Sequence, residues 1–257
     1  MVGDKEPIIR VENFTAAYAG NVIIDNISFD VYPGEVFVIL GGSGCGKSTV
    51  LKHMIGLYEP AAGKLIIDGD DIATAEGDDL LGILKKIGVA YQSGALFGSM
   101  TILENVRLPL EQYTDLSPEA MDLICRMKLK LVGLSGSENK MPSELSGGMQ
   151  KRAALARAMA LDPLILFLDE PSAGLDPITS AELDQLILRL AHSLKITFVV
   201  VTHELPSIYT IADRVIMLDK RVKGIVATGE PHYLRDHSDN PWVRQFFNRE
   251  VESEAAA

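Results

Sequence analysis

Hydrophobic and polar residues alternate along the first part of the chain. The segments IIRVENFTAAY (residues 8–18) and VIIDNISFDV (residues 22–31) are rich in β-branched side chains that alternate with polar ones. This pattern is typical of strands that bury one face, and we expect an antiparallel pair here. The segment GKLIIDGDDI (residues 63–72) predicts a further strand followed by a turn.

Several later segments are continuously apolar instead of alternating. They are EVFVIL (35–40), GVAYQ (88–92), PLILFLDE (163–170), ITFVVVTH (196–203) and DRVIMLDK (213–220). Such short runs indicate strands buried on both faces of a parallel sheet, and they cannot span a bilayer. Helical patterns lie between them, at 48–57, 78–87 and 177–194. The order predicts an α/β protein whose parallel sheet carries helices on both faces.

The pattern changes between about residue 93 and residue 160. Apolar residues now recur at helical spacing in TILENVRLPL (101–110), SPEAMDLICRMKLKLVGL (117–134) and GGMQKRAALARAMAL (147–161). Pro118 directly follows Ser117, which suits the first turn of a helix. We expect an α-helical subdomain here, inserted into the α/β core.

The end of the chain predicts one more helix, after a core domain of residues 1–237. NPWVRQFFNRE (240–250) places Trp242, Val243, Phe246 and Phe247 on one helical face. That face packs either on its own chain or on a second copy or regulatory subunit. The final EVESEAAA (250–257) is acidic and then alanine-rich, and we expect it to be disordered.

Composition narrows the function classes. The net charge of the 257 residues is −11 and there is no basic tract, which argues against nucleic-acid binding. Cys45 and Cys125 are the only cysteines, so there is no disulfide framework, and this suits a reducing cytosol. The N-terminus MVGDKEPIIR is not a signal peptide.

The segment GGSGCGKST (41–49) carries the most specific chemistry. It fits G-x-x-x-x-G-K-[ST] between an expected strand and an expected helix, which is the context of a phosphate-binding loop. Backbone N–H groups would surround phosphate oxygens, while the Lys47 ammonium reaches the β- and γ-phosphates and the Ser48 hydroxyl reaches Mg²⁺. The alternative is a chance glycine-rich turn. The predicted ATP-binding residues are Gly41, Gly42, Ser43, Gly44, Cys45, Gly46, Lys47, Ser48 and Thr49.

Cys45 lies inside this loop, near a predicted helix N-terminus. The helix dipole should lower the pKa of the thiol and raise its reactivity. The alternative is an inert, buried thiol.

Polar residues follow three of the expected parallel strands. Asp169 and Glu170 end PLILFLDE, where Asp169 would hold Mg²⁺ and Glu170 would polarise the attacking water. His203 ends ITFVVVTH and would contact the γ-phosphate. Gln92 ends GVAYQ, and its amide suits Mg²⁺ or water. The alternatives are a solvated acidic turn and a structural histidine.

A second anion cradle is found in LSGGMQKR (145–152). Ser146, Gly147 and Gly148 open a predicted helix, so free N–H groups and a hydroxyl stand at its positive end. One nucleotide does not need two cradles so far apart in the sequence.

Together these segments resemble the ATP-binding subunit of an ABC transporter, over residues 8–235. The resemblance implies a P-loop NTPase core of the RecA-like type, with an antiparallel β subdomain and the inserted helical subdomain. In that family the serine and glycines of LSGG bind ATP held by the other subunit of a head-to-tail homodimer. It also implies that Tyr18 stacks on adenine, although a core tyrosine is the alternative. Asp176, in SAGLD (172–176), would lie beside the partner's site.

One position departs from the family pattern. Met149 stands where glutamine is usual. We expect little loss, because Ser146 and the glycine N–H groups make the anion contact.

Further segments resemble the ATPase of Mla-type, MCE-associated phospholipid transporters. They are YQSGALF (91–97), NVRLPL (105–110), LSGGMQKR and VRQFF (243–247). This resemblance implies a multi-spanning permease, a periplasmic MCE lipid-binding protein and, in some systems, a small regulatory subunit. It implies a peripheral location on the cytoplasmic face of the inner membrane. The apolar segment 94–110 is expected to dock on the permease.

Three rival functions remain open at this point. The first is the ATPase of another ABC importer, such as an amino-acid importer. The second is a soluble ABC protein acting on ribosomes or DNA, although those resemble tandem cassettes or carry basic arms. The third is a P-loop kinase or GTPase, in which the LSGG segment would have no role.

Overall fold

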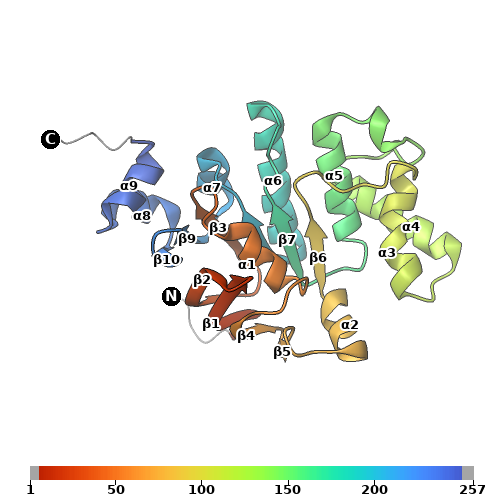
Figure 1. Ribbon diagram of the computed structural model, residues 1–257. Helices are drawn as coiled ribbons and strands as arrows, with labels where there is room; N and C mark the ends of the chain where they lie inside the picture. The colour runs from red at the N-terminus through yellow and green to blue at the C-terminus, as the bar shows by residue number, and fades with distance from the viewer. Residues whose placement is uncertain (1–5, 251–257) are drawn as a thin grey trace.

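The computed structural model describes residues 6–250, and its strands form two sheets (Figure 1). The smaller sheet is antiparallel, in the order β2-β1-β4-β5. Its strands are β1 (Ile9–Tyr18), β2 (Asn21–Val31), β4 (Ala62–Ile67) and β5 (Asp70–Asp71). In the first part of β1, Val11 pairs with Phe29 and with Leu65, and all three side chains are buried.

A bulge interrupts the alternation in β1. Asn13 has a φ of 49°, a left-handed conformation that asparagine tolerates better than most residues. The pairing register shifts between Val11 and Phe14, so the buried positions move from Ile9 and Val11 to Phe14 and Ala16. The predicted antiparallel pair is confirmed, with further register shifts between Phe14 and Ala17.

The larger sheet has the order β10-β9-β3-β8-β7-β6. Its first five strands along the chain run parallel, and β10 is antiparallel to β9. The strands are β3 (Val36–Gly41), β6 (Ile87–Ala90), β7 (Ile165–Asp169), β8 (Thr197–Val201), β9 (Arg214–Asp219) and β10 (Gly224–Gly229). This arrangement confirms the predicted parallel sheet.

Each face of the larger sheet has its own core. Ile165 and Phe167 of β7 pack into the cluster that contains α1 (Lys47–Met54), α2 (Gly77–Lys85) and the smaller sheet. Leu166 and Leu168 pack into the opposite cluster. That cluster contains α3 (Ile102–Tyr113), α4 (Pro118–Leu131), α5 (Gly147–Ala158), α6 (Pro177–Leu194) and α7 (Leu205–Ile211). Because both faces are covered, the strands are apolar throughout.

Helices α3, α4 and α5 form the end of the molecule farthest from α8 and α9 (Figure 1). Thr101 and Glu104 make a reciprocal capping box at the start of α3. Ser117 caps α4, with Pro118 in its first turn as predicted. A 3₁₀ turn, η1 (Pro142–Glu144), precedes α5. The helices expected between residues 93 and 160 are thus present.

The last two helices, α8 (Pro231–His237) and α9 (Pro241–Asn248), follow β10. Val243 and Phe247 of α9 are buried in the main core, and Tyr209 Oη donates a 2.9 Å hydrogen bond to the Phe247 carbonyl. Trp242 and Phe246 are only half-buried. The predicted apolar face therefore packs on its own chain, with Trp242 and Phe246 only partly covered. The expected disorder of residues 251–257 lies outside the described residues.

Across residues 6–250, none of the helices has the length and apolar character needed to cross a membrane.

Candidate nucleotide-binding and hydrolysis site

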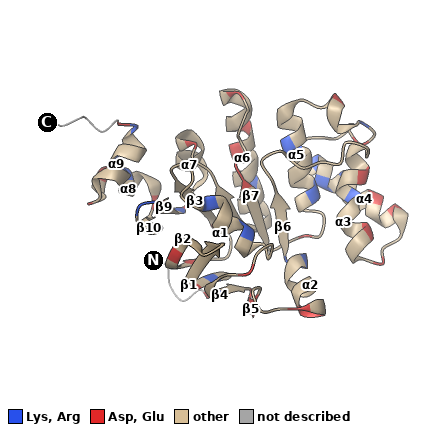
Figure 2. Cartoon of the chain, in the orientation of Figure 1, with Lys and Arg blue, Asp and Glu red and all other residues tan. Residues whose placement is uncertain are grey.

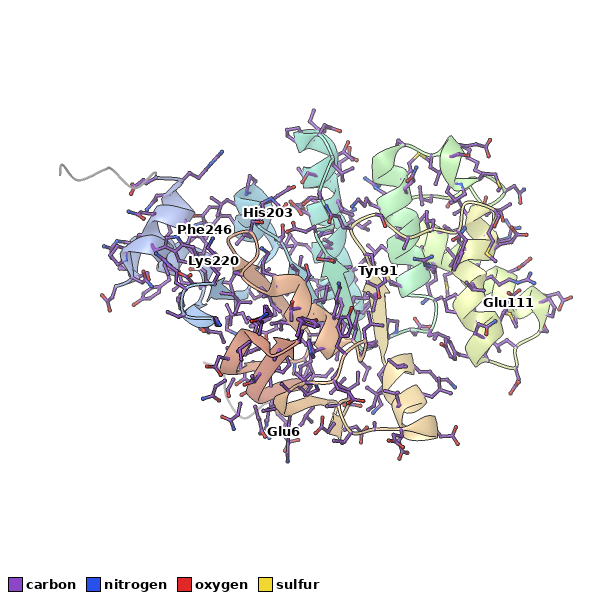
Figure 3. All side chains as sticks on the ribbon, in the orientation of Figure 1. Glu6, Tyr91, Glu111, His203, Lys220 and Phe246 are labelled. Atoms are coloured by element: carbon purple, nitrogen blue, oxygen red, sulfur yellow. The ribbon has the colours of Figure 1, made fainter. Side chains whose placement is uncertain are left out.

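The predicted site residues gather at one edge of the larger sheet. The phosphate loop follows β3, Gln92 follows β6, Asp169 ends β7 and His203 follows β8. These four strands are parallel and adjacent, in the order β3-β8-β7-β6, so their carboxyl ends meet at the same edge. That edge is where open α/β sheets bind ligands. Tyr91 and His203, labelled in Figure 3, lie on either side of β7.

The phosphate loop needs glycine at two points for steric reasons. A Cβ on Gly41, whose φ is 146°, would lie 2.3 Å from the Leu218 carbonyl oxygen. A Cβ on Gly46, whose φ is 101°, would lie 2.6 Å from the Ile24 side chain. The Lys47 ammonium donates hydrogen bonds of 2.9 and 3.2 Å to the carbonyls of Gly41 and Gly42. The loop therefore curls around the ammonium that would meet the phosphates.

The expectation for Cys45 is wrong. The side chain is 2% exposed, and burial raises the pKa of its thiol, while the nearby Lys47 ammonium opposes the rise only in part. Desolvation outweighs the favourable position near the start of α1, because a buried thiolate loses its hydration. Cys45 fills space beneath the loop, within 2.7 Å of where a Cβ on Gly41 would lie.

Asp169 and Glu170 leave two buried oxygens without a hydrogen-bond partner among the described residues. These are Asp169 Oδ1 and Glu170 Oε2. Burial, followed by the neighbouring Glu170 carboxylate, raises the pKa of Asp169. Buried acceptors of this kind are seldom left unpaired, so both oxygens are suited to receive a cation or a water molecule.

Glu170 is held in an unusual conformation. Its φ is 46°, which is uncommon for a non-glycine residue, and its N–H donates a 2.8 Å hydrogen bond to the Val201 carbonyl. Its Oε1 lies 2.8 Å from Nδ1 of His203. Because an ionised carboxylate only accepts, Nδ1 carries the proton in this arrangement. The structure thus pairs the two predicted catalytic side chains directly, which their separation in sequence did not reveal.

Gln92 and Asp169 line the same open hollow of about 500 Å³. Carboxylate, amide and hydroxyl oxygens are the ligands that Mg²⁺ prefers, together with waters and substrate phosphates. Among the described residues there is no cluster of three or more metal-binding acids, histidines or cysteines. Asp169 and Gln92 bring a carboxylate and an amide oxygen to one hollow, a donor set that suits Mg²⁺.

Tyr18 ends β1 and is 38% exposed, so the core-tyrosine alternative is wrong. Its ring meets the Tyr58 ring edge-on, with centroids 5.6 Å apart. His53 of α1 lies behind both rings, and its Nδ1 is 2.7 Å from the Thr49 carbonyl. An exposed aromatic face beside the phosphate-loop helix is suited to stacking on a base.

The second cradle is built as the sequence predicts. Ser146 caps α5, and its hydroxyl accepts a 3.3 Å hydrogen bond from the Met149 N–H. Ser146 and Gly147 are exposed, whereas Gly148 is buried. A Cβ on Gly148 would lie 2.4 Å from Cγ2 of Thr179, so α5 and α6 require glycine at this crossing.

Asp176 caps α6, the helix that Gly148 of α5 contacts through Thr179. Its carboxylate accepts hydrogen bonds from the N–H groups of Ile178 and Thr179 and from the Thr179 hydroxyl. These bonds lower the pKa of Asp176, the hydroxyl bond most. The contact of Asp176 with a partner's site stays a prediction.

The two cradles belong to helices on opposite sides of the sheet. The helix α1, which begins in the phosphate loop, and the helix α5, which begins after Ser146, pack on opposite faces of the larger sheet. Figure 2 shows basic residues on both helices. Each cradle is thus the N-terminus of a separate helix, which favours an anion.

Two basic residues of α5 were missed by the sequence analysis. Lys151 Nζ donates to the carbonyl of Gln92. Arg157 donates hydrogen bonds of 2.7 and 2.9 Å to the carbonyls of Ala95 and Gly94. The sequence feature that could have identified them is their position in an alanine-rich helix that packs in the core. A cation in such a helix needs specific hydrogen-bond acceptors.

Comparison with known proteins agrees with this geometry. The ABC transporter family matches residues 24–173. MlaF, the ATP-binding protein of an intermembrane phospholipid transport system in Escherichia coli K12, is 43% identical over 242 residues, covering 94% of this chain and 88% of MlaF. A probable ribonucleotide transport ATP-binding protein, mkl, from Mycobacterium leprae is 43% identical over 240 residues, covering 93% of this chain and 68% of mkl.

Solved structures show the same architecture. A bacterial ABC transporter cassette, a dimer in a post-hydrolysis state bound to ADP and Pi, matches with a TM-score of 0.78 at 32% identity, covering 86% of this chain and 98% of its own. The protein cbiO1 from Clostridium perfringens matches with a TM-score of 0.81 at 27% identity, covering 88% and 90%. The chain belongs to the ABC transporter family, in which it is an ATP-binding subunit that hydrolyses ATP.

Proposed function

We propose that this chain is the ATPase of a phospholipid transporter, working as a head-to-tail homodimer that clamps two ATP molecules. The observation that carries the dimer is the placement of the two anion cradles on opposite faces of the larger sheet. Each ATP then lies between the phosphate loop of one copy and Ser146 of the other. The matching bacterial cassette was solved as a dimer, which supports this arrangement.

In the proposed reaction, Glu170 polarises the water that attacks the γ-phosphate. His203 holds one oxygen of the Glu170 carboxylate, which leaves Oε2 for the water. Asp169, Gln92 and Ser48 are the proposed Mg²⁺ ligands. When bound, this ion neutralises charge on the β- and γ-phosphates. Lys47 leaves the carbonyls of Gly41 and Gly42 to pair with phosphate oxygens.

The Glu170→Gln variant tests the dimer and the catalytic assignment together. The amide keeps the shape of the side chain but removes the base, so we expect normal ATP binding, almost no phosphate release and a stable ATP-bound dimer. Sedimentation with and without Mg-ATP measures the dimer, and Glu182→Gln on exposed α6 is the matched control. Near-normal turnover of the Glu170→Gln protein would exclude Glu170 as the catalytic residue.

The permease dock is proposed to be a groove of about 430 Å³ between the sheet and the helical subdomain. Phe97 and Tyr113, both large exposed rings, line it beside Pro109. Arg157 lines the same groove and fixes the carbonyls of Gly94 and Ala95, just after Gln92. A permease segment seated here would therefore be coupled to the Mg²⁺ site through one short loop.

The Phe97→Asp variant tests this dock. A carboxylate in an apolar interface is costly to desolvate, so we expect ATP binding to persist while the permease no longer co-purifies. Leu123→Asp on α4 is the control, because it changes another exposed apolar residue that does not line the groove. If the folded Phe97→Asp protein assembles and transports normally, the docking assignment is wrong.

The phospholipid substrate rests on the likeness to MlaF. We place the complex in the inner membrane, with this chain on the cytoplasmic face, the permease within the bilayer, an MCE lipid-binding protein in the periplasm and, where present, a small regulatory subunit. Purification of the complex followed by lipid extraction tests the substrate class. Bound amino acid or nucleoside in place of phospholipid would contradict it.

A further inference from the structure

We infer that Lys151 is a positioning residue, which connects the helix of the second ATP cradle to the catalytic carboxylate of the same chain. The inference rests on the proposed role of Glu170. Lys151 lies in the second turn of α5, the helix capped by Ser146. The position is therefore close to the surface that would meet the partner's ATP.

Lys151 spans two site loops. Its Nζ donates to the carbonyl of Gln92 and lies 3.5 Å from the carbonyl of Glu170. Gln92 follows β6, and Glu170 follows β7. One ammonium thus joins the ends of two neighbouring strands to the helical subdomain, and a displacement of α5 acts on both.

Lys151 is partly buried beside the carboxylates of the site. Burial lowers the pKa of Lys151, and the carboxylates of Asp169, Glu170 and Glu204 oppose this shift only in part. Its aliphatic stem lines a cavity of about 20 Å³, which it shares with Tyr91 and Pro171. A space of this size holds about one water molecule, so the side chain has little freedom to choose other partners.

Glu170 needs an external support for its backbone. Its left-handed φ of 46° is a conformation that persists only where neighbouring groups hold it. The Val201 carbonyl holds its N–H, and Lys151 is the cation beside its carbonyl. The orientation of this peptide sets where the side chain points, and so the 2.8 Å contact with His203.

The experiment compares three variants in the complex purified with its permease. Lys151→Met keeps the length and apolar stem but removes every donor, and Lys151→Gln keeps an N–H donor. Lys130→Met is the matched control, because it makes the same change at an exposed lysine of the same helical subdomain, on α4. Each variant is measured for kcat, KM, binding of a fluorescent ATP analogue and thermal unfolding.

We expect Lys151→Met to lower kcat about tenfold, or about 1.4 kcal/mol, with KM and ATP binding unchanged. Lys151→Gln should recover most of kcat, and Lys130→Met should match wild type. The inference is overturned if Lys151→Met stays within twofold of wild type, if its loss lies in ATP binding, or if Lys151→Gln is no better than Lys151→Met. Because Glu170→Gln separately tests the catalytic carboxylate, full activity of that variant would overturn the proposed function instead.

Discussion

Asp184 is the buried acid whose removal should stabilise the protein. It lies on α6, is 3% exposed and faces Ser207 of α7. Among the described residues, neither Asp184 Oδ1 nor Ser207 Oγ has a hydrogen-bond partner. Burial raises the pKa of Asp184 to about 6. The Ser207 hydroxyl opposes this rise in pKa, and the Glu204 carboxylate adds to it.

The sign of the effect follows from the number of bound protons. Between its ordinary pKa of 3.8 and about 6, Asp184 is protonated more in the native than in the unfolded chain, so stability falls as the pH rises through this range. Above about pH 6 the full loss of folding stability caused by the buried Asp184 carboxylate is present. The difference between the two pKa values corresponds to about 3 kcal/mol, of which about half has already appeared by pH 5.

Urea unfolding of Asp184→Asn at pH 5 and pH 7.5 measures this cost. The neutral amide can donate to Ser207, so the variant should be more stable than wild type, and the gap should widen by about 1.4 kcal/mol between the two pH values. Glu182→Gln, an exposed acid on the same helix, should show no such widening. A constant gap between Asp184→Asn and wild type would refute the reasoning.

Three further results are expected. Gly148→Ala should destabilise the fold by about 1–3 kcal/mol in urea unfolding, because its Cβ would meet Thr179 Cγ2. Adding Thr179→Ser, which removes this methyl group but keeps the hydroxyl bonded to Asp176, should recover most of the lost stability. If stability is not recovered, the steric explanation is wrong. Cys45 should react slowly with iodoacetamide whether or not ATP is present, because its thiol is buried and has a raised pKa. Mass spectrometry measures the labelling, and rapid labelling of the nucleotide-free protein would contradict this prediction. Truncation after Ser238 should lower the melting temperature, because it uncovers the partners of Val243 and Phe247, each worth about 1.5–3 kcal/mol. If Trp242 and Phe246 also pack on a second copy, the paired change Trp242→Ser with Phe246→Ser should weaken the nucleotide-free dimer in sedimentation. An unaltered dimer would assign α9 to its own chain.

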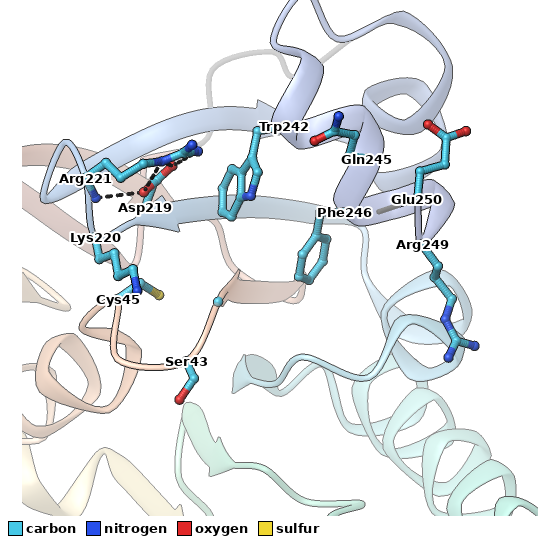
Figure 4. Close-up of a pocket in the computed structure, with 11 residues that line it drawn as sticks. Ser43, Cys45, Asp219, Lys220, Arg221, Trp242, Gln245, Phe246, Arg249 and Glu250 are labelled. Atoms are coloured by element: carbon cyan, nitrogen blue, oxygen red, sulfur yellow. Dashed lines mark hydrogen bonds and ion pairs between the residues drawn. The ribbon is translucent and has the colours of Figure 1, made fainter. Parts of the chain in front are cut away.

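Figure 4 shows the surroundings of Trp242 and Phe246, the two half-buried rings of α9. Trp242 and Phe246 point from α9 toward the phosphate-loop segment that carries Ser43 and Cys45, across an open space of about 800 Å³. Arg221 lies over the Trp242 ring at 5.0 Å and pairs with Asp219. The helical periodicity alone placed four apolar residues on one face, but only the packing shows that two of them are fully buried and two are partly buried.

The structure adds α7, β10 and α8, which no sequence pattern predicted. The sequence by itself predicted the other long strands and helices and the phosphate-binding loop. These depend on local rules: continuous apolar runs for buried strands, helical spacing for residues 101–161, and glycines before Lys47 where the backbone must approach a phosphate. The caps at Ser117 and Ser146 are equally local, since each hydroxyl meets an N–H three residues onward.

Only the tertiary structure decided which residues far apart in the sequence are in contact and in which direction the pKa of Cys45 shifts. His203 reaches Glu170 because β8 lies beside β7, and Lys151 reaches Gln92 because α5 packs over the end of β6. The local position of Cys45 pointed to a lowered pKa, whereas its burial raises it. Strand order and burial are set by the whole core, since desolvation and cross-chain contacts depend on neighbours that are far away in the sequence.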